Sequence, residues 1–262
     1  MKLNLRILVY LNPSNIDKVT HKFNLQADSG FIFVRDSILA LNKIEDWHFY
    51  VLVPEDSYET CWPNKPKNVT LIRYPYINDA LNSRFHFDTS TIIKHFNVYK
   101  HDIDAMWTML PEHAGAMKAF SSKRREEIPV FSYVAWTDFK KRKGYEPIYK
   151  YSTAQGFVNS DLVGIQSNHM LQFMKDVIFK DFNNIDYSKV RIVNPKTRIV
   201  DYPREIGEIV AFPHRVSTES GFSVMFEMAK PILKHKLWIT NINGATVEED
   251  DKLIIKRYEN HD

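Results

Sequence analysis

Residues Gly207–Gly244 read GEIVAFPHRVSTESGFSVMFEMAKPILKHKLWITNING. The apolar run Ile209–Phe212 predicts a strand, Ser217–Ser220 predicts the start of a helix, and Leu237–Thr240 predicts a second strand. A strand, a helix and a second strand in this order indicate an α/β unit with parallel strands. We therefore expect this segment to begin a second α/β domain.

The turn that follows the first of these strands is basic. It contains Pro213, His214 and Arg215 directly before the predicted helix. A cation at the carboxyl end of a strand, next to a helix N-terminus, favours a bound phosphate. The alternative is a surface arginine at a strand end, and the residues alone leave both interpretations open.

The chain upstream of this segment alternates between predicted strands and predicted helices, which is typical of a mostly parallel sheet with helices on both faces. We therefore expect a Rossmann-like α/β domain here. Short apolar runs predict strands at Leu5–Leu11, Phe49–Val53, Val69–Tyr74, Ile103–Met109, Pro129–Val134, Leu162–Gln166 and Val190–Val193. Helical spacing predicts helices after Ser29-Gly30 (Phe31, Val34, Ile38, Leu41), at Asp88–Val98, at Glu112–Phe120 behind Pro111, at Tyr149–Asn159, and from a capping Asn168 to Phe179.

Composition excludes several classes of protein. The 262 residues are 44% hydrophobic and carry a net charge of +3, which is too small to require a nucleic-acid partner. The single cysteine, Cys61, excludes a disulfide framework and fits a cytoplasmic protein. No apolar stretch is long enough for a membrane span. The histidines lack metal-ligand spacing, so we expect no metal site, and no motif calls for a cofactor.

Several motifs together resemble the GT-B glycosyltransferases, specifically the retaining type with two Rossmann-like domains. The motifs are Asp28–Phe31, Asp104 with Trp107, Pro111 and Glu112, the strand and turn YVAWTDF (Tyr133–Phe139), DLVGIQSNHM, and FPHRVSTESGF (Phe212–Phe222). The resemblance implies a sugar transferase that uses a nucleotide-sugar donor.

The resemblance also implies a donor site in the second domain. The family has an arginine after the opening strand and, five positions on, a lysine before a glycine, and both cations contact the donor diphosphate. Arg215 and Gly221 match this pattern, whereas Ser220 stands at the lysine position, so the diphosphate clamp is incomplete. Gly30, in the first domain, is expected to let the backbone approach a ligand.

Acceptor contacts are expected from the first domain, at Trp107, Glu112 and Trp136. The resemblance implies a polar or acid–base residue after the strand Val130–Val134, and Asp138 is the matching candidate. The alternative for Asp138 is a helix N-cap. Two basic clusters, Lys123–Arg125 and Lys140–Lys143, have two interpretations. They are solvated charges on loops or, alternatively, they line a groove that binds an anionic acceptor such as DNA.

We expect residues 1–205 to form the acceptor domain and residues 206–262 to form a partial or minimal nucleotide-sugar-binding lobe, joined by the linker Pro195–Ile206. This second part is short for a Rossmann-like domain, so the chain is truncated, half of a split gene that needs a partner chain, or a minimal relative. The alternative function is a non-catalytic acceptor-binding module. A composition rich in Lys, Asn and Ile suggests a phage, and hence a modified DNA base as the acceptor.

Overall fold

The protein divides into two compact units, which are described separately. The first unit is Met1–Lys196 and the second unit is Thr197–Asp262. The computed structural model describes residues 4–11, 25, 28–74, 102–121, 127–134, 146–193, 210–212, 222–232, 237–239 and 253–255. The domain boundary predicted at residue 205 lies outside these residues, and the roles assigned to the two domains stay predictions.

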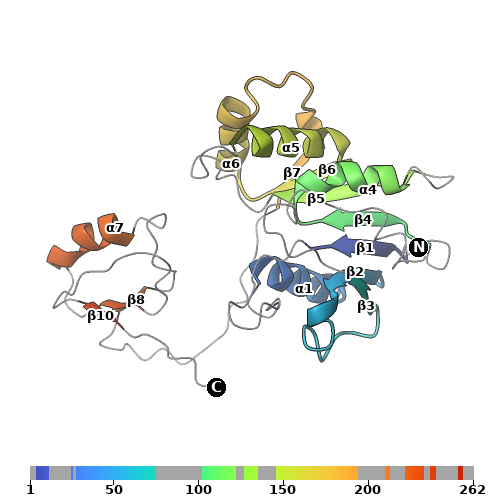
Figure 1. Ribbon diagram of the computed structural model, residues 1–262, viewed down its shortest axis with the longest axis horizontal. Coiled ribbons are helices and arrows are strands. Elements are labelled where there is room, and N and C mark those ends of the chain that lie inside the picture. The colour runs from blue at the N-terminus through green and yellow to red at the C-terminus, as the bar shows by residue number, and fades with distance from the viewer. Residues whose placement is uncertain are drawn as a thin grey trace. The chain divides into compact units, whose positions relative to one another are not determined.

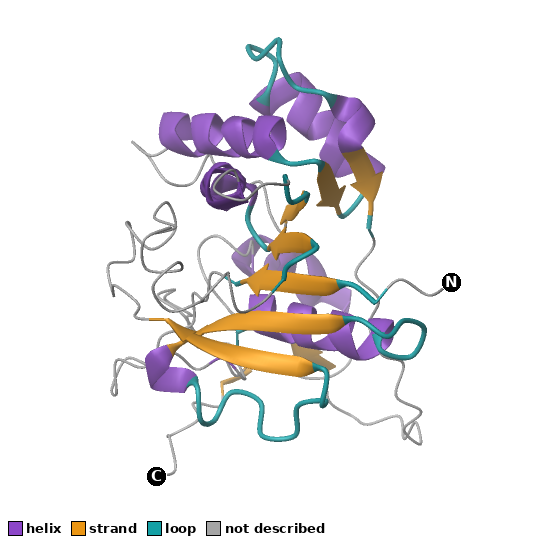
Figure 2. Ribbon diagram, turned by 90° about the vertical axis from the view of Figure 1, so that its right-hand side faces the viewer, coloured by secondary structure: helices purple, strands orange, loops and turns teal. Residues whose placement is uncertain are grey.

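The first unit is built on a seven-stranded sheet whose strand order is β3-β2-β1-β4-β5-β6-β7 (Figures 1 and 2). Every neighbouring pair is parallel, and Val9 at the centre lies opposite Val51 on one side and Trp107 on the other. This is the doubly wound Rossmann order, so the predicted fold class is confirmed. The strands are β1 (Arg6–Tyr10), β2 (His48–Pro54), β3 (Val69–Tyr74), β4 (Ala105–Thr108), β5 (Val130–Val134), β6 (Leu162–Ile165) and β7 (Val190–Ile192).

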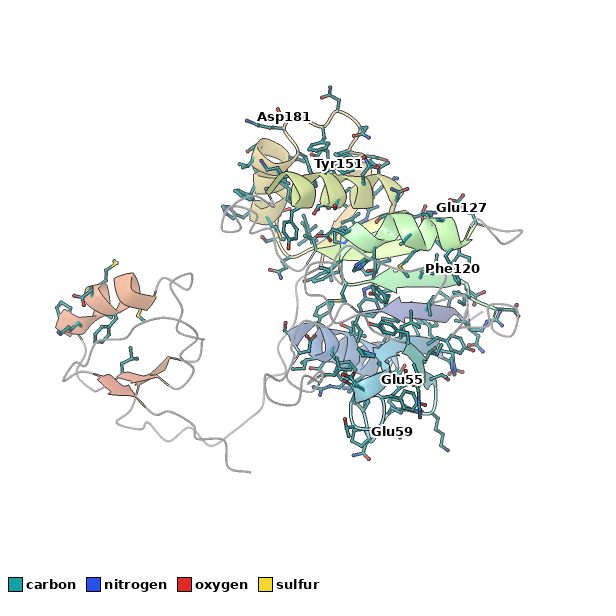
Figure 3. All side chains as sticks on the ribbon, in the orientation of Figure 1. Glu55, Glu59, Phe120, Glu127, Tyr151 and Asp181 are labelled. Carbon is teal, nitrogen blue, oxygen red and sulfur yellow. The ribbon has the colours of Figure 1, made fainter. Side chains whose placement is uncertain are left out.

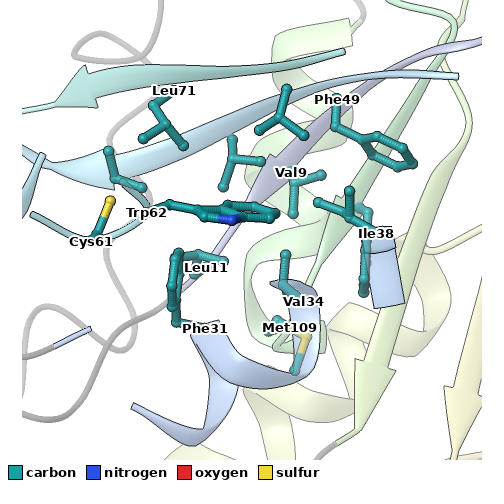
Figure 4. Packing of buried hydrophobic residues seen from close by; sticks show 14 of the residues in the cluster. Val9, Leu11, Phe31, Val34, Ile38, Phe49, Cys61, Trp62, Leu71 and Met109 are labelled. Atoms are coloured by element: carbon teal, nitrogen blue, oxygen red, sulfur yellow. The ribbon is translucent and has the colours of Figure 1, made fainter. Parts of the chain in front are cut away.

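One face of this sheet packs against α1 (Ser29–Leu41). The helix buries Phe31, Val34 and Ile38 at helical spacing, as the sequence predicts. Figure 4 shows the indole of Trp62 inside the same cluster, with Cys61 beside it. The cluster continues along alternate strand positions such as Ile7, Val9 and Leu11, because successive side chains of a strand point to opposite faces.

The other face packs against α4 (Ala114–Ser121) and α5 (Glu146–Asn159). Buried side chains of α4 meet the intervening strand positions Leu8, Tyr10, Leu52 and Met106. A further cluster joins Tyr149, Ala154 and Phe157 of α5 to β5, β6 and the helical segment after β6. Helices therefore cover both faces, as predicted, and the strands are buried apolar runs for that reason.

The helix after β6 differs from the prediction in two ways. Its N-cap is Ser167, whose hydroxyl accepts a hydrogen bond from the Met170 amide at 3.1 Å, so the assignment of Asn168 as the cap was wrong by one residue. α6 (Asn168–Phe173) then continues as a π-helix, Met174–Ile178. The predicted helix Asp88–Val98 and the linker Pro195–Ile206 lie outside the described residues.

The second unit contains a three-stranded parallel sheet in the order β10-β9-β8, and its described helical segments are α7 (Phe222–Ala229) and the 3-10 helix Lys230–Ile232 that follows it. The strands β8 (Val210–Phe212) and β9 (Leu237–Ile239) match the prediction. β10 (Leu253–Ile255) was not predicted, so counting only two strands in this part was wrong. The expected helix start, Ser217–Ser220, lies outside the described residues.

Among the helices that the structure describes, none combines the length and the apolar character that crossing a membrane requires.

Candidate functional site

The carboxyl ends of β1 and β4 mark the point where the strand order of the first unit reverses. β1 pairs with β2 on one side and with β4 on the other, and the Met109 amide after β4 donates a hydrogen bond to the Tyr10 carbonyl at 3.3 Å. In open parallel sheets, ligands bind outside the carboxyl ends of the strands at such a switch point. The candidate site therefore lies at this edge.

The turn that leaves β4 is fixed by a buried threonine. Thr108 is fully buried, and its hydroxyl donates to the Leu110 carbonyl at 3.0 Å and accepts from the Leu110 amide at 3.3 Å. A short 3-10 turn, Pro111–His113, follows and leads into α4. Proline suits the first position of a helical turn because its missing amide proton would have no partner there. This arrangement places Glu112 directly after the switch point.

Glu112 is half-buried and contacts α5. The hydroxyl of Thr153, which is 2% exposed, donates to Glu112 Oε1 at 3.4 Å, and Glu112 Oε2 is buried. The two segments approach closely because α5 has a glycine at the contact. A Cβ on Gly156 would lie 2.1 Å from the carbonyl oxygen of Pro111. The glycine thus lets α5 support the turn that carries Glu112.

His113, the next residue of the turn, is fully buried in an aromatic group. Its ring meets that of Tyr10 edge-on, with centroids 4.9 Å apart and planes at 83°. Tyr10 in turn contacts the ring of Tyr74, at a centroid distance of 5.9 Å. These contacts tie the turn after β4 to the ends of β1 and β3, so the backbone around Glu112 is held from the sheet as well as from α5.

The N-terminus of α1 lies at the same edge, because α1 follows β1, and it is capped by a carboxylate of the chain itself. Asp28 is 2% exposed and accepts a hydrogen bond from the Phe31 amide at 3.0 Å. A Cβ on Gly30 would lie 3.1 Å from Asp28 Oδ1, so glycine leaves room for the cap. The structure thus shows Gly30 supporting the capping aspartate, and its predicted role in donor binding stays a prediction.

Three aromatic rings meet on the α1 face near the carboxyl ends of β4 and β5. Phe33 stacks on Tyr133 with centroids 4.6 Å apart, and its ring lies edge-on to Trp107 at 6.3 Å. Trp107 is only 7% exposed, so the structure places this predicted acceptor contact in the core. Burial raises the pKa of the Tyr133 phenol above its ordinary value, and the nearby Gln166 side chain opposes that shift.

The structure brings together some of the predicted site residues and leaves others undescribed. Gly30, Trp107 and Glu112 all lie in the first unit near the carboxyl edge of its sheet, with Trp107 and Glu112 on opposite faces of it. The remaining candidates lie outside the described residues: Trp136, Asp138, Arg215, Ser220 and Gly221. Within the described part of the chain, no three His, Cys, Asp or Glu side chains form a group that could hold a metal ion.

Sequence reasoning missed three residues that shape this edge, namely Asp28 as a cap, Thr153 and Gly156. The cap had a local signal, because an aspartate precedes a run with helical spacing. No local sequence pattern indicates the role of Thr153, since its partner Glu112 is 41 positions away in the sequence. The only sequence signal for Gly156 is that a glycine occurs inside a predicted helix, where it is unfavourable unless packing requires it.

Comparison with known proteins yields a likeness of fold. No family model matches the chain, and no curated protein matches it. UGT89C1 from Arabidopsis thaliana, solved in complex with quercetin, superposes with a TM-score of 0.52 and 14% sequence identity, over 97% of this chain and 69% of that chain. UGT71G1 from Medicago truncatula, in complex with UDP-glucose, gives a TM-score of 0.49 and 11% identity over 96% and 68%.

The solved structures with which this fold is shared are GT-B glycosyltransferases. The first unit thus has the architecture of a Rossmann-like GT-B half: a parallel sheet in doubly wound order, covered by helices on both faces. At this level of sequence identity the likeness establishes the architecture alone, and the chemistry has to be inferred from the residues of this chain.

Proposed function

We propose that this protein is a glycosyltransferase that moves a sugar from a nucleotide-sugar donor to a hydroxyl group of an acceptor. One observation carries the proposal. The chain contains seven parallel strands in doubly wound order, and 97% of this chain superposes on a solved GT-B glycosyltransferase. This coverage includes both units, which favours a transferase over a non-catalytic module that lacks a donor lobe.

The donor is proposed to bind at the turn after β8 in the second unit. Arg215 and Gly221 match the family's diphosphate-binding pattern, and an arginine can form two parallel hydrogen bonds with a phosphate. UGT89C1 has been solved with UDP and with UDP-L-rhamnose, and UGT71G1 with UDP-glucose. A uridine diphosphate sugar is therefore the first donor to test.

The acceptor is proposed to bind at the carboxyl edge of the first unit, with Glu112 from the turn after β4 and Asp138 and Trp136 from the loop after β5. Trp107, also predicted as an acceptor contact, is buried, and its ring lies edge-on to that of Phe33. The identity of the acceptor, including a modified DNA base, and a cytoplasmic location stay predictions. A gel-shift titration with duplex DNA at two salt concentrations tests the DNA acceptor, since phosphate contacts make binding strongly salt-dependent.

Titration calorimetry with UDP-glucose and a GDP-sugar tests the donor site directly. Loss of a charge-assisted hydrogen bond in Arg215→Ala should weaken donor binding by about 1.5–3 kcal/mol, or about 10- to 150-fold. The matched control is Arg35→Ala, because Arg35 lies on α1 and pairs with its neighbour Asp36 at 2.9 Å. A folded wild-type protein that binds neither sugar nucleotide would refute the proposal.

A further inference from the structure

The N-terminus of α1 is the place where a doubly wound unit commonly binds a phosphate, and in this chain a carboxylate occupies it. In such units the helix after the first strand directs its amide groups and the positive end of its dipole at the anion. Here the Asp28 side chain accepts a hydrogen bond from the Phe31 amide at 3.0 Å, and Asp28 is 2% exposed. A phosphate at this position would have to displace a buried side chain that carries the same sign of charge.

The glycine beside this carboxylate makes room for the cap. In dinucleotide-binding turns a glycine lets the pyrophosphate approach the backbone. A Cβ on Gly30 would lie 3.1 Å from Asp28 Oδ1, so the space that this glycine leaves is next to the aspartate oxygen. The pair of Asp28 and Gly30 therefore closes the end of α1 that a phosphate would use.

The neighbouring turns add negative charge to the same edge of the sheet. Among the described residues that directly follow β1, β2, β4 and β6, none is Lys or Arg; these residues are Leu11, Glu55–Ser57, Met109–His113 and Gln166–Asn168. Glu55 (labelled in Figure 3) and Asp56 are exposed, and Glu112 is half-buried. Arg73, one residue before the end of β3, is paired with Glu59. A phosphate at this edge would thus meet carboxylates on two turns and at the start of α1.

Cations of the first unit lie instead at the opposite edge, where the parallel strands begin. Arg6, the first residue of β1, pairs with Asp104 at 3.3 Å. Lys118 pairs with Asp161, directly before β6, at 2.7 Å, and Lys65 donates to the first carbonyl of β3 at 2.8 Å. The two edges therefore differ in charge, and the candidate site lies at the acidic one.

We infer that the carboxyl edge of the first unit takes an acceptor that carries no phosphate, and that the N-terminus of α1 is closed to the donor diphosphate; the part about the acceptor rests on the proposed function. The closed helix end follows from the occupied amide of Phe31. The class of acceptor follows from the carboxylates of the edge, which repel a phosphate most strongly at low salt. A neutral hydroxyl compound fits this edge and duplex DNA does not. Gly30 then supports the cap and does not bind the donor.

Amide NMR of the whole chain at low salt, with inorganic phosphate as the probe, tests the closed helix end. We expect no saturable shift of the amides of residues 29–31 in the wild type. Asp28→Gly should open the site, because glycine is accepted at an N-cap but offers no oxygen, and phosphate should then bind these amides at least about 10-fold more tightly. Asp28→Asn is the matched control, since it keeps an oxygen on the Phe31 amide and should behave as the wild type.

Two results of this titration would overturn the closed helix end. The first is a saturable shift of these amides in the wild type. The second is a folded Asp28→Gly protein that binds phosphate no better than the wild type, because the carboxylate would then not be what excludes the anion. If Asp28→Gly does not fold, the wild-type titration decides.

Duplex DNA is the second probe, because it carries a phosphate on every nucleotide. We expect it to leave the amides of Glu55, Asp56 and Glu112 unshifted at low salt. Shifts of these amides that vanish as salt is added would show that the edge binds phosphates, and they would overturn the inferred class of acceptor.

The failure of this inference and the failure of the proposed function are distinguishable. If the wild-type chain binds neither UDP-glucose nor a GDP-sugar, the proposed function fails and the part about the acceptor fails with it, while the phosphate titration still decides whether α1 is closed. If UDP-glucose binds and shifts the amides of residues 29–31 to saturation, the proposed function stands and the closed helix end is refuted. Transfer of glucose from UDP-glucose to duplex DNA would support the proposed function and refute the inferred class of acceptor.

Discussion

Gly156 of α5 lies so close to Pro111 that a Cβ on the glycine would be 2.1 Å from the proline carbonyl oxygen. A real Cβ never approaches a backbone oxygen this closely, so any other residue must push α5 away from the turn after β4. The same helix carries Thr153, one turn earlier, which donates to Glu112. One glycine therefore sets both the packing of α5 and the position of the Glu112 carboxylate.

Gly156→Ala should destabilise the protein by about 3 kcal/mol, the upper part of the range for overpacked positions, because the obstructing atom belongs to the backbone. Urea unfolding measures the change in the free energy of unfolding. Gly115→Ala in α4 is the control, since among the described residues the nearest atom to its Cβ would be Asn159 Nδ2, at an ordinary contact distance of 3.4 Å. Alanine is the better helix former, so the control should range from no change to a gain of about 1 kcal/mol. Equal effects of the two substitutions would contradict the steric account.

Asp28→Ala should lower the free energy of unfolding by about 1–2 kcal/mol, the usual cost of losing an N-cap. Its carboxylate accepts from the Phe31 amide at 3.0 Å in a buried position, so the amide loses its partner in the variant. Asp28→Asn should retain most of the stability, because asparagine caps helices about as well. Circular dichroism during thermal unfolding gives the comparison, and an asparagine variant as unstable as the alanine variant would argue for a role of the charge itself.

A buried pair of serines links β5 to the end of α5. The hydroxyls of Ser132 and Ser160 lie 2.7 Å apart, and Ser160 donates to the Gly156 carbonyl at 2.7 Å, so Ser132 is the donor within the pair. Either single alanine substitution should cost about 1–3 kcal/mol by leaving a buried polar partner. The double variant should cost less than the sum of the singles. Additive effects in this double-mutant cycle would show that the hydroxyls do not interact.

The strands of the first unit could be predicted because both faces of the sheet are covered, which makes strands such as Phe49–Val53 short continuous apolar runs. β10 escaped prediction because the three residues Leu253–Ile255 give too short a run to distinguish from a loop. The contact of Glu112 with Thr153 could not be predicted, since it joins residues 41 positions apart and depends on how α5 packs. Local patterns thus locate the elements, and the candidate site arises from packing between them.

Cys61 should resist alkylation in the folded protein. Its side chain is buried, and burial raises the pKa of the thiol to about 11, so little reactive thiolate exists at pH 8. We expect slow labelling by iodoacetamide in buffer and rapid labelling in urea, followed by mass spectrometry. Fast labelling of the native protein would show that the thiol is accessible.

The raised pKa also predicts how stability depends on pH. The unfolded thiol, with its ordinary pKa near 8.5, loses its proton before the folded one, whose pKa is about 11. The contribution of this group to stability is therefore complete below about pH 8.5 and is lost as the pH rises toward 11. Cys61→Ala should unfold with a weaker dependence on pH in this range. An identical dependence in the two proteins would assign the effect to other groups.

Ser220 occupies the position at which the GT-B glycosyltransferases that this chain resembles have a second cation for the donor diphosphate. Ser220→Lys should therefore tighten binding of UDP-glucose if the segment after β8 holds the diphosphate, because a second positive charge would compensate the phosphates that Arg215 is proposed to bind. We expect a gain of about 1 kcal/mol or more at low salt, measured by calorimetry, with part of the gain kept at moderate salt. The matched control is Ser223→Lys in α7, which adds the same charge to the same unit. A gain of equal size in both variants that vanishes with salt would indicate nonspecific attraction, and it would remove the diphosphate site from this turn.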